Sequence, residues 1–226
     1  MKNLPGIIVG IEKELDEKDK VRELAIKASR ELIRLSKDVL GAMNRKEDTR
    51  PLLAKLKKEA CNLRSQTQRY PGIYHAGYVE AALAEVVETC VVLAILNKAP
   101  LPTPKELFAT PEAYLLGLGD VVGELRRMSV EALREMRPEQ AELRLTEMET
   151  IYGQLMRFDY PDAVVSLRKK QDVARSLIER TRGEVLVARS EKALKDKLDR
   201  VAAQLDRVVN QGPNPDRRQR DQGRRH

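Results

Sequence analysis

Apolar residues recur every three or four positions along most of the chain, which is the spacing of one face of an α-helix. This pattern predicts long helices, which cover about residues 6–44, 52–69, 74–97, 113–136, 138–158 and 162–209. The Pro-rich segment 99–113 is expected to be a loop with one short helical turn. No segment alternates apolar and polar residues as a half-buried strand does, so the pattern predicts an all-α protein.

Composition agrees with helices and indicates the kind of partner. The 226 residues are 42% hydrophobic, 34% charged and only 4% aromatic, with a formal net charge of +7. A basic balance favours a polyanionic partner. We expect one domain over residues 1–209 and a disordered basic tail over residues 210–226, where apolar residues are almost absent.

The remaining composition excludes several classes. No apolar run approaches the length of a membrane span, and the short apolar start is followed at once by acids, unlike a signal peptide. We therefore expect a cytoplasmic protein with no membrane partner. Cys61 and Cys90 both lie in apolar helical patterns and are expected to be reduced core thiols.

The segment AYLLGLGDVVGELRR, residues 113–127, combines three glycines with two acids. At 100° per residue, Asp120 and Glu124 share one face, and Arg127 joins it one turn later. Mid-helix glycines weaken a helix, so we expect them to make room for a ligand or for a closely packed helix. A structural alternative stays open: an acid pair neutralised by arginines at a helix contact.

A third acid lies on the preceding predicted helix. Glu80 shares a side with apolar residues, Glu88 borders that side two turns on, and Glu85 points away from it. If the two helices pack together, Glu80 can join Asp120 and Glu124. Converging carboxylates repel one another unless a cation neutralises them, and the hard ions Mg²⁺ or Mn²⁺ suit oxygen ligands. Such a cluster can activate water for phosphodiester hydrolysis.

The first predicted helix carries basic residues on one side. They recur at three and four positions and form a stripe, which consists of Lys27, Arg30, Arg34 and Lys37. A phosphate-backbone track is the functional interpretation, and a solvated charged face is the structural one. His75, among three tyrosines at the turn near residue 71, is a further candidate for contact with RNA.

Four stretches of the chain resemble the translin and translin-associated factor X (TRAX) family. YLLGLGDVVGELRRMSVEAL resembles the family's YLLG…D…GEL helix, and GYVEAALAE resembles the TRAX YVEA helix. KASRELIRLSKDVL is similar to the first-helix LSRD segment, and KKQDVARSLIERTRGE is similar to the closing stretch. Together these stretches cover most of residues 18–186, and the retained acids place the chain closer to the TRAX-like branch.

The resemblance implies an all-α subunit of about seven helices that assembles into a hollow oligomer, typically an octamer. Translin-type subunits bind single-stranded RNA or DNA, and TRAX-type subunits carry an acidic, Mg²⁺-dependent endoribonuclease site inside the shell. The TRAX acids match Glu80, Asp120 and Glu124. TRAX has another glutamate three residues before the match to Glu80, where this chain has Gly77, so Glu88 becomes a substitute ligand.

The expected function is therefore a TRAX-like endoribonuclease that cleaves single-stranded or partly structured RNA, with single-stranded DNA as a second candidate ligand. The catalytic residues are expected to be Glu80, Asp120 and Glu124, and the ligands of Mg²⁺ or Mn²⁺ to be Glu80, Glu88, Asp120 and Glu124. RNA contacts are assigned to Lys27, Arg30, Arg34, Lys37, His75 and Arg127. Two alternatives stay open, a non-catalytic translin-like binding oligomer and a helical scaffold without nucleic acid.

Overall fold

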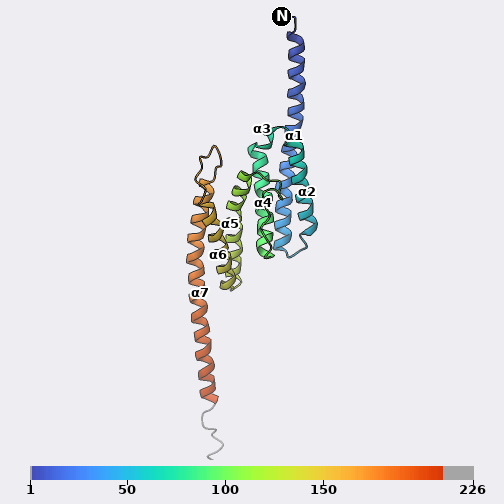
Figure 1. Cartoon of the computed structure of the whole chain (residues 1–226). Helices are drawn as coiled ribbons and strands as arrows, with labels where there is room; N and C mark the ends of the chain where they lie inside the picture. Colours follow the sequence, from blue (N-terminus) through green and yellow to red (C-terminus); the bar gives the residue numbers. More distant parts are fainter. Residues whose placement is uncertain (1, 211–226) are drawn as a thin grey trace, which may run out of the picture.

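The computed structural model describes residues 2–210, and in that range the regular elements are seven helices (Figure 1). In chain order these are α1 (Leu4–Asn44), α2 (Arg50–Thr67), α3 (Pro71–Tyr74), α4 (Gly77–Leu96), α5 (Pro111–Arg134), α6 (Pro138–Leu155) and α7 (Arg168–Asn210). The all-α prediction is confirmed. The tail predicted over residues 210–226 lies outside the described residues, except that Asn210 ends α7.

Proline marks the start of five helices. It occupies the first turn of α1, α2, α3, α5 and α6, where its missing N–H costs no intrahelical hydrogen bond and its fixed φ suits the helix. At α5 the Thr110 hydroxyl also accepts a hydrogen bond from the Ala113 N–H, at 3.0 Å. These local signals explain why most predicted boundaries lie within a few residues of the observed ones, although α7 begins at Arg168 and not at 162.

α4 is the centre of the bundle. It packs between α1 and α5, while α6 and α7 pack on α5 from the other side (Figure 1). Its side chains from Val79 to Val92 are buried on nearly every face, in agreement with the apolar pattern. Cys90 is buried there as predicted, whereas Cys61 on α2 is only half-buried, and both are free thiols.

Glycines allow α5 to approach its neighbours closely. A Cβ on Gly117 would lie 2.6 Å from the Ala84 carbonyl oxygen and 2.7 Å from the Val87 Cβ on α4. A Cβ on Gly119 would lie 2.9 Å from the Lys170 Cβ on α7. Gly123 faces open space, with nothing within 4 Å of such an atom. Two of the three glycines therefore make room for a closely packed helix, which is one of the two uses predicted from the sequence.

Both long helices extend beyond the packed body, in opposite directions. α1 projects at one end with its first buried residue at Ala25, and α7 projects at the other, with Val185 its last buried residue up to position 207 (Figure 1). Within residues 2–210, no helix is both long enough and apolar enough to cross a membrane.

The contact at Gly117 predicts different outcomes for two otherwise similar substitutions. Gly117→Ala should lower the free energy of unfolding by about 1–3 kcal/mol, because the new methyl group meets the α4 backbone. Gly123→Ala should raise it by about 0.5–1 kcal/mol, because the site is open and alanine favours helix. Urea denaturation followed by circular dichroism measures both, and a Gly117→Ala protein as stable as the wild type would contradict this account of the helix contact.

Candidate active site

Four carboxylates lie together where α4 packs against α5. Glu85 and Glu88 come from α4, and Asp120 and Glu124 come from α5. Burial raises the pKa of the Glu88 carboxyl to about 8, and the negative charges of Asp120, Glu85 and Glu124 add to this effect. Two helices running in parallel at close approach, with Gly117 against Ala84 and Val87, bring these side chains to the same level.

Cations from other helices border the four carboxylates. The Lys170 ammonium on α7 pairs with Asp120. Arg127 donates from Nε to Glu124 Oε2 at 2.9 Å and from Nη2 to Asn44 Oδ1 on α1 at 2.8 Å. The Glu124 side chain is only 11% exposed, and its carboxylate is held by the ion pair with Arg127. The acids are therefore partly neutralised by the protein itself.

The start of α7 is fixed in position by hydrogen bonds. The Gln171 side-chain amide, which is buried, donates to the carbonyl oxygens of Leu155 and Phe158, both at 2.9 Å. Further along, Arg126 of α5 forms a two-point ion pair with Glu184 of α7, at 2.5 and 2.8 Å. These contacts, together with the space left by Gly119, place Lys170 beside Asp120.

Glu85 corrects an expectation from the sequence. The helical projection placed it away from the acidic face, yet in the structure it is half-buried and close enough to Asp120 to be influenced by its charge. Burial raises the pKa of Glu85, Asp120 raises it further, and Lys37 and Lys170 lower it. The signal in the sequence was the spacing of Glu85 and Glu88, because residues three apart lie on the same side of a helix.

The structure does not bring Glu80 to Asp120 and Glu124. Glu80 lies in the first turn of α4, beside His75 and beside Glu112 in the first turn of α5, and potential ligand atoms of these three residues lie within 4.8 Å of one another. The separation between His75 Nδ1 and Glu80 Oε1 is 3.7 Å. Glu112 and Asp120 are eight residues apart on one helix, so the two acidic groups are separated by about 12 Å along the bundle.

A pocket of 440 Å³ opens beside His75, Glu80 and Glu112, and its other wall is the segment 162–166. Burial and the charge of Glu112 raise the pKa of Glu80, while His75 lowers it. Among the described residues, the group of His75, Glu80 and Glu112 brings potential ligand atoms close enough for one ion, whereas Glu88 and its acidic neighbours are shown only to influence one another by charge. The group at Glu80 includes an imidazole, and the group at Glu88 has carboxylates only.

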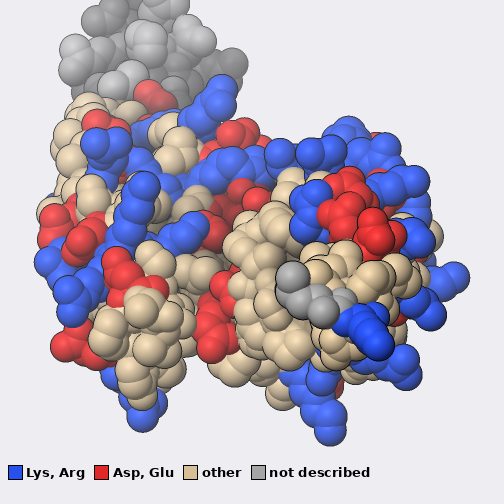
Figure 2. Space-filling view, turned by 90° about the horizontal axis from the view of Figure 1, so that it is seen from above, with Lys and Arg blue, Asp and Glu red and all other residues tan. Residues whose placement is uncertain are grey.

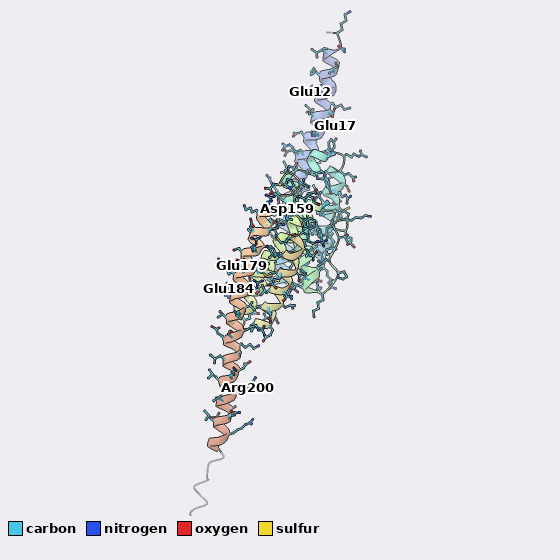
Figure 3. The ribbon with its side chains drawn as sticks, turned by 60° about the vertical axis from the view of Figure 1, so that its left-hand side comes forward. Glu12, Glu17, Asp159, Glu179, Glu184 and Arg200 are labelled. Atoms are coloured by element: carbon cyan, nitrogen blue, oxygen red, sulfur yellow. The ribbon has the colours of Figure 1, made fainter. Side chains whose placement is uncertain are left out.

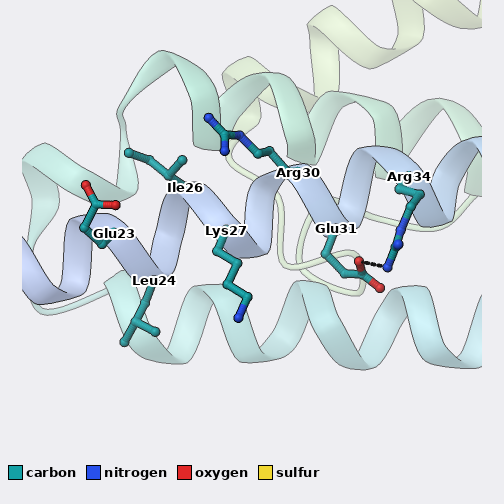
Figure 4. Close-up of a pocket in the computed structure, with 7 residues that line it drawn as sticks. All are labelled: Glu23, Leu24, Ile26, Lys27, Arg30, Glu31 and Arg34. Carbon is teal, nitrogen blue, oxygen red and sulfur yellow. Dashed lines mark hydrogen bonds and ion pairs between the residues drawn. The ribbon is translucent and has the colours of Figure 1, made fainter.

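The predicted basic stripe is only partly continuous. Lys27, Arg30 and Arg34 line a surface hollow of 690 Å³ along α1 (Figure 4). Arg34 pairs with Glu31, which also lies 3.5 Å from Lys55 Nζ, and Lys27 points towards α2 while Arg30 points to the opposite side. Lys37 instead lies close enough to Glu85 for its charge to lower the pKa of that carboxyl. Viewed from above, basic side chains alternate with acidic ones across the surface (Figure 2).

The protein is an α-helical bundle with acidic side chains close together between two neighbouring helices, α4 and α5. Residues 20–187 match the Translin family, and the chain belongs to this family. It is 33% identical over 188 residues to an uncharacterized protein of Methanocaldococcus jannaschii, MJ0175, an alignment that covers 83% of this chain and 85% of the relative. The family resemblance noted in the sequence is confirmed at this level.

Solved structures give the same result. The crystal structure of AfC3PO superposes with a TM-score of 0.75 at 34% identity, over 82% of this chain and 98% of that one. AfC3PO in complex with duplex RNA gives 0.69 at 31% identity, with the same coverage. Apo-NeC3PO gives 0.71 at 22% identity, over 80% and 96%, which shows a shared fold.

The Glu88 carboxyl predicts an unusual pH dependence of stability. Its pKa in the folded state lies above the value of about 4.3 for an exposed glutamate. The free energy of unfolding therefore falls as the pH rises from about 4 to 8 and the group ionises. In a metal-free buffer, Glu88→Gln should remove about 2–4 kcal/mol of that loss. Urea unfolding at pH 5 and pH 8 measures it, with Glu179→Gln on the exposed side of α7 as the control.

Added Mn²⁺ or Mg²⁺ should reduce the loss at pH 8 in the wild type, because a bound cation stabilises the ionised carboxylates. The same ions should have less effect on Glu88→Gln. Equal pH profiles for the wild type and Glu88→Gln would contradict the burial of an acidic group at this position.

Proposed function

We propose that this protein is a metal-dependent endoribonuclease whose site is formed by Glu85, Glu88, Asp120 and Glu124. The convergence of four carboxylates from α4 and α5 is the observation that carries the proposal. Oxygen donors of this kind suit Mg²⁺, with Mn²⁺ as an alternative, better than softer ions. The proposal belongs to the TRAX-like branch of the family, in which the sequence resemblance implies such an acidic site.

The family pattern gives the spacing of this glutamate pair but matches it to other positions. The resemblance implies two glutamates three positions apart on the helix that faces the acids of the YLLG segment. Gly77 and Glu80 do not provide such a pair, but Glu85 and Glu88 do. In this assignment Glu85 and Glu88 replace the positions that the resemblance matches at Gly77 and Glu80, and Glu80 is left to a different role beside His75 and Glu112.

When bound, the metal ion would position and deprotonate a water molecule for in-line attack on the phosphodiester and would stabilise charge on the phosphate oxygens. The four carboxylates would hold it. Lys170, which pairs with Asp120 in the structure, is placed to turn towards the scissile phosphate once Asp120 has another cation. Arg127, half-exposed beside Glu124, supplies a second positive charge for the same phosphate.

RNA is the proposed substrate, in single-stranded or partly structured form, and single-stranded DNA is a second candidate ligand. AfC3PO, which is similar to this chain, has been solved with duplex RNA. Lys27, Arg30 and Arg34 along α1 are the proposed backbone contacts, with Lys37 and Arg127 closer to the acids and His75 at the mouth of the other pocket. We place this chemistry in a cytoplasmic homo-oligomeric shell, with eight subunits as the expected number.

A non-catalytic RNA-binding oligomer is the second candidate. The ion pairs of Asp120 with Lys170 and of Glu124 with Arg127 favour it, because they neutralise two of the four acids without a metal. In that case the carboxylates would have a structural role only. Cleavage distinguishes the two candidates, and binding alone does not.

Cleavage of a labelled RNA tests the site directly. With Mg²⁺, the wild type should cut, and Glu88→Gln and Asp120→Asn should lower the rate by about 10²–10³-fold, because each loses a ligand of the ion. Glu80→Gln is the matched control and should retain most of the activity. EDTA should abolish cleavage. If Glu80→Gln is inactive and Glu88→Gln is active, the site is at His75, Glu80 and Glu112. If no protein cuts but all bind RNA, the second candidate is correct.

RNA affinity tests the basic residues of α1. Lys27→Ala with Arg30→Ala should weaken binding at all sequences and should lower the slope of log affinity against log salt by roughly 0.7 per lost phosphate contact. Arg180→Ala, an exposed site on α7, should leave both unchanged. Fluorescence anisotropy over a series of salt concentrations measures the effect. An unaltered slope for the double variant would mean that these residues form a solvated charged face without phosphate contacts.

A further inference from the structure

The two projecting ends of α1 and α7 are helices with no cover from their own chain. We define the α1 overhang as residues 4–20 and the α7 overhang as residues 193–207, beyond the ion pair of Lys192 with Glu139 at 2.5 Å. Every side chain in both segments is exposed, and Figure 3 shows Glu12 and Glu17 on one and Arg200 on the other. Isolated helices of this length are only marginally stable in water.

Each overhang has an apolar stripe of the same form. Its four members follow one another at four, three and four residues, which is the a and d spacing of a coiled coil. All eight side chains are between 43% and 60% exposed. The stripes consist of Leu4, Ile8, Ile11 and Leu15 on α1, and of Leu194, Leu198, Val201 and Leu205 on α7.

The α7 stripe is not an extension of the face that packs on the body. Val185 is buried against the bundle, and Leu194 follows it by nine residues. At 100° per residue these two side chains point in opposite directions. Whatever covers Leu194 and its neighbours therefore approaches from the side away from the body of the same chain.

Charges beside the stripes select the partner. Glu12 and Glu14 lie between the last two members of the α1 stripe, and Lys195 and Lys197 lie between the first two members of the α7 stripe. Flanking positions of this kind form ion pairs between the helices of a coiled coil. In an antiparallel register that matches the apolar layers, two α1 overhangs would place these glutamates opposite Pro5 and Ile7, and two α7 overhangs would place the lysines opposite Ala202 and Gln204. Neither pairing of like segments therefore forms these ion pairs.

We propose that the α1 overhang of one copy pairs in antiparallel orientation with the α7 overhang of a second copy. In this register four apolar layers match, and Glu12 and Glu14 flank the same two layers as Lys195 and Lys197. The layers are Leu4 with Leu205, Ile8 with Val201, Ile11 with Leu198, and Leu15 with Leu194. If a two-fold axis relates the copies, the same contact forms twice.

The contact is separate from the proposed nuclease site. Both stripes lie outside residues 20–187, the range that matches the Translin family. The pairing therefore adds to whatever contacts the family body makes between subunits, and it does not depend on catalysis.

A charge exchange tests which helices pair. Glu12→Lys with Glu14→Lys should weaken self-association, and so should Lys195→Glu with Lys197→Glu, each by about tenfold or more in the dissociation constant because like charges then face each other. The chain with all four substitutions should recover the wild-type value. Light scattering over a dilution series measures the association. Glu17→Lys with Arg207→Glu, on the opposite faces, is the control and should change nothing.

A second pair of variants blocks the stripes themselves. Ile8→Glu with Ile11→Glu, and separately Leu198→Glu with Leu205→Glu, should each give particles of lower mass than the wild type, and mixing the two proteins should restore association. Circular dichroism confirms that each remains helical. An α1-blocked or α7-blocked chain that keeps the wild-type mass overturns the proposal, as does a four-residue charge exchange that fails to restore association.

Discussion

The close contact of α5 with α4 at Gly117 is the constraint on which the candidate site depends. With no side chain at this position, the α5 backbone lies against the Ala84 carbonyl and Val87, and the two helices run in parallel at one fixed register. A shift by one helical turn would move Asp120 away from Glu88 by about 5.4 Å. The glycine therefore determines which acids meet, although it takes no part in the chemistry itself.

The cluster formed by this register is electrostatically unfavourable for the fold. Burial and three neighbouring acids act in the same direction on Glu88, and only Lys170 opposes them. Lys170 and Arg127 each hold one of the α5 acids, and Gln171 fixes the helix that carries Lys170.

Most of the fold could be predicted from the sequence, because it depends on local signals. The three- and four-residue apolar spacing gave the helices, prolines marked five of their starts, and the unbroken apolar run of residues 90–96 indicated that α4 is central. The site was harder to predict from the sequence. The sequence identified Asp120 and Glu124 on one face and Glu88 nearby. That Glu85, and not Glu80, lies near Asp120 follows only from the contact between the helices, because the pattern within one helix contains no information on its register against another.

Lys170 has a consequence for how an ion would bind at this site. Because the chain carries its own positive charge at Asp120, the acidic group is partly balanced by Lys170 alone, without a metal ion. In the proposed site, binding of an ion would be an exchange of one cation for another, in which the displaced ammonium stays attached at the edge of the site. The affinity for such an ion would then be set by a competition with Lys170, in the first turn of α7.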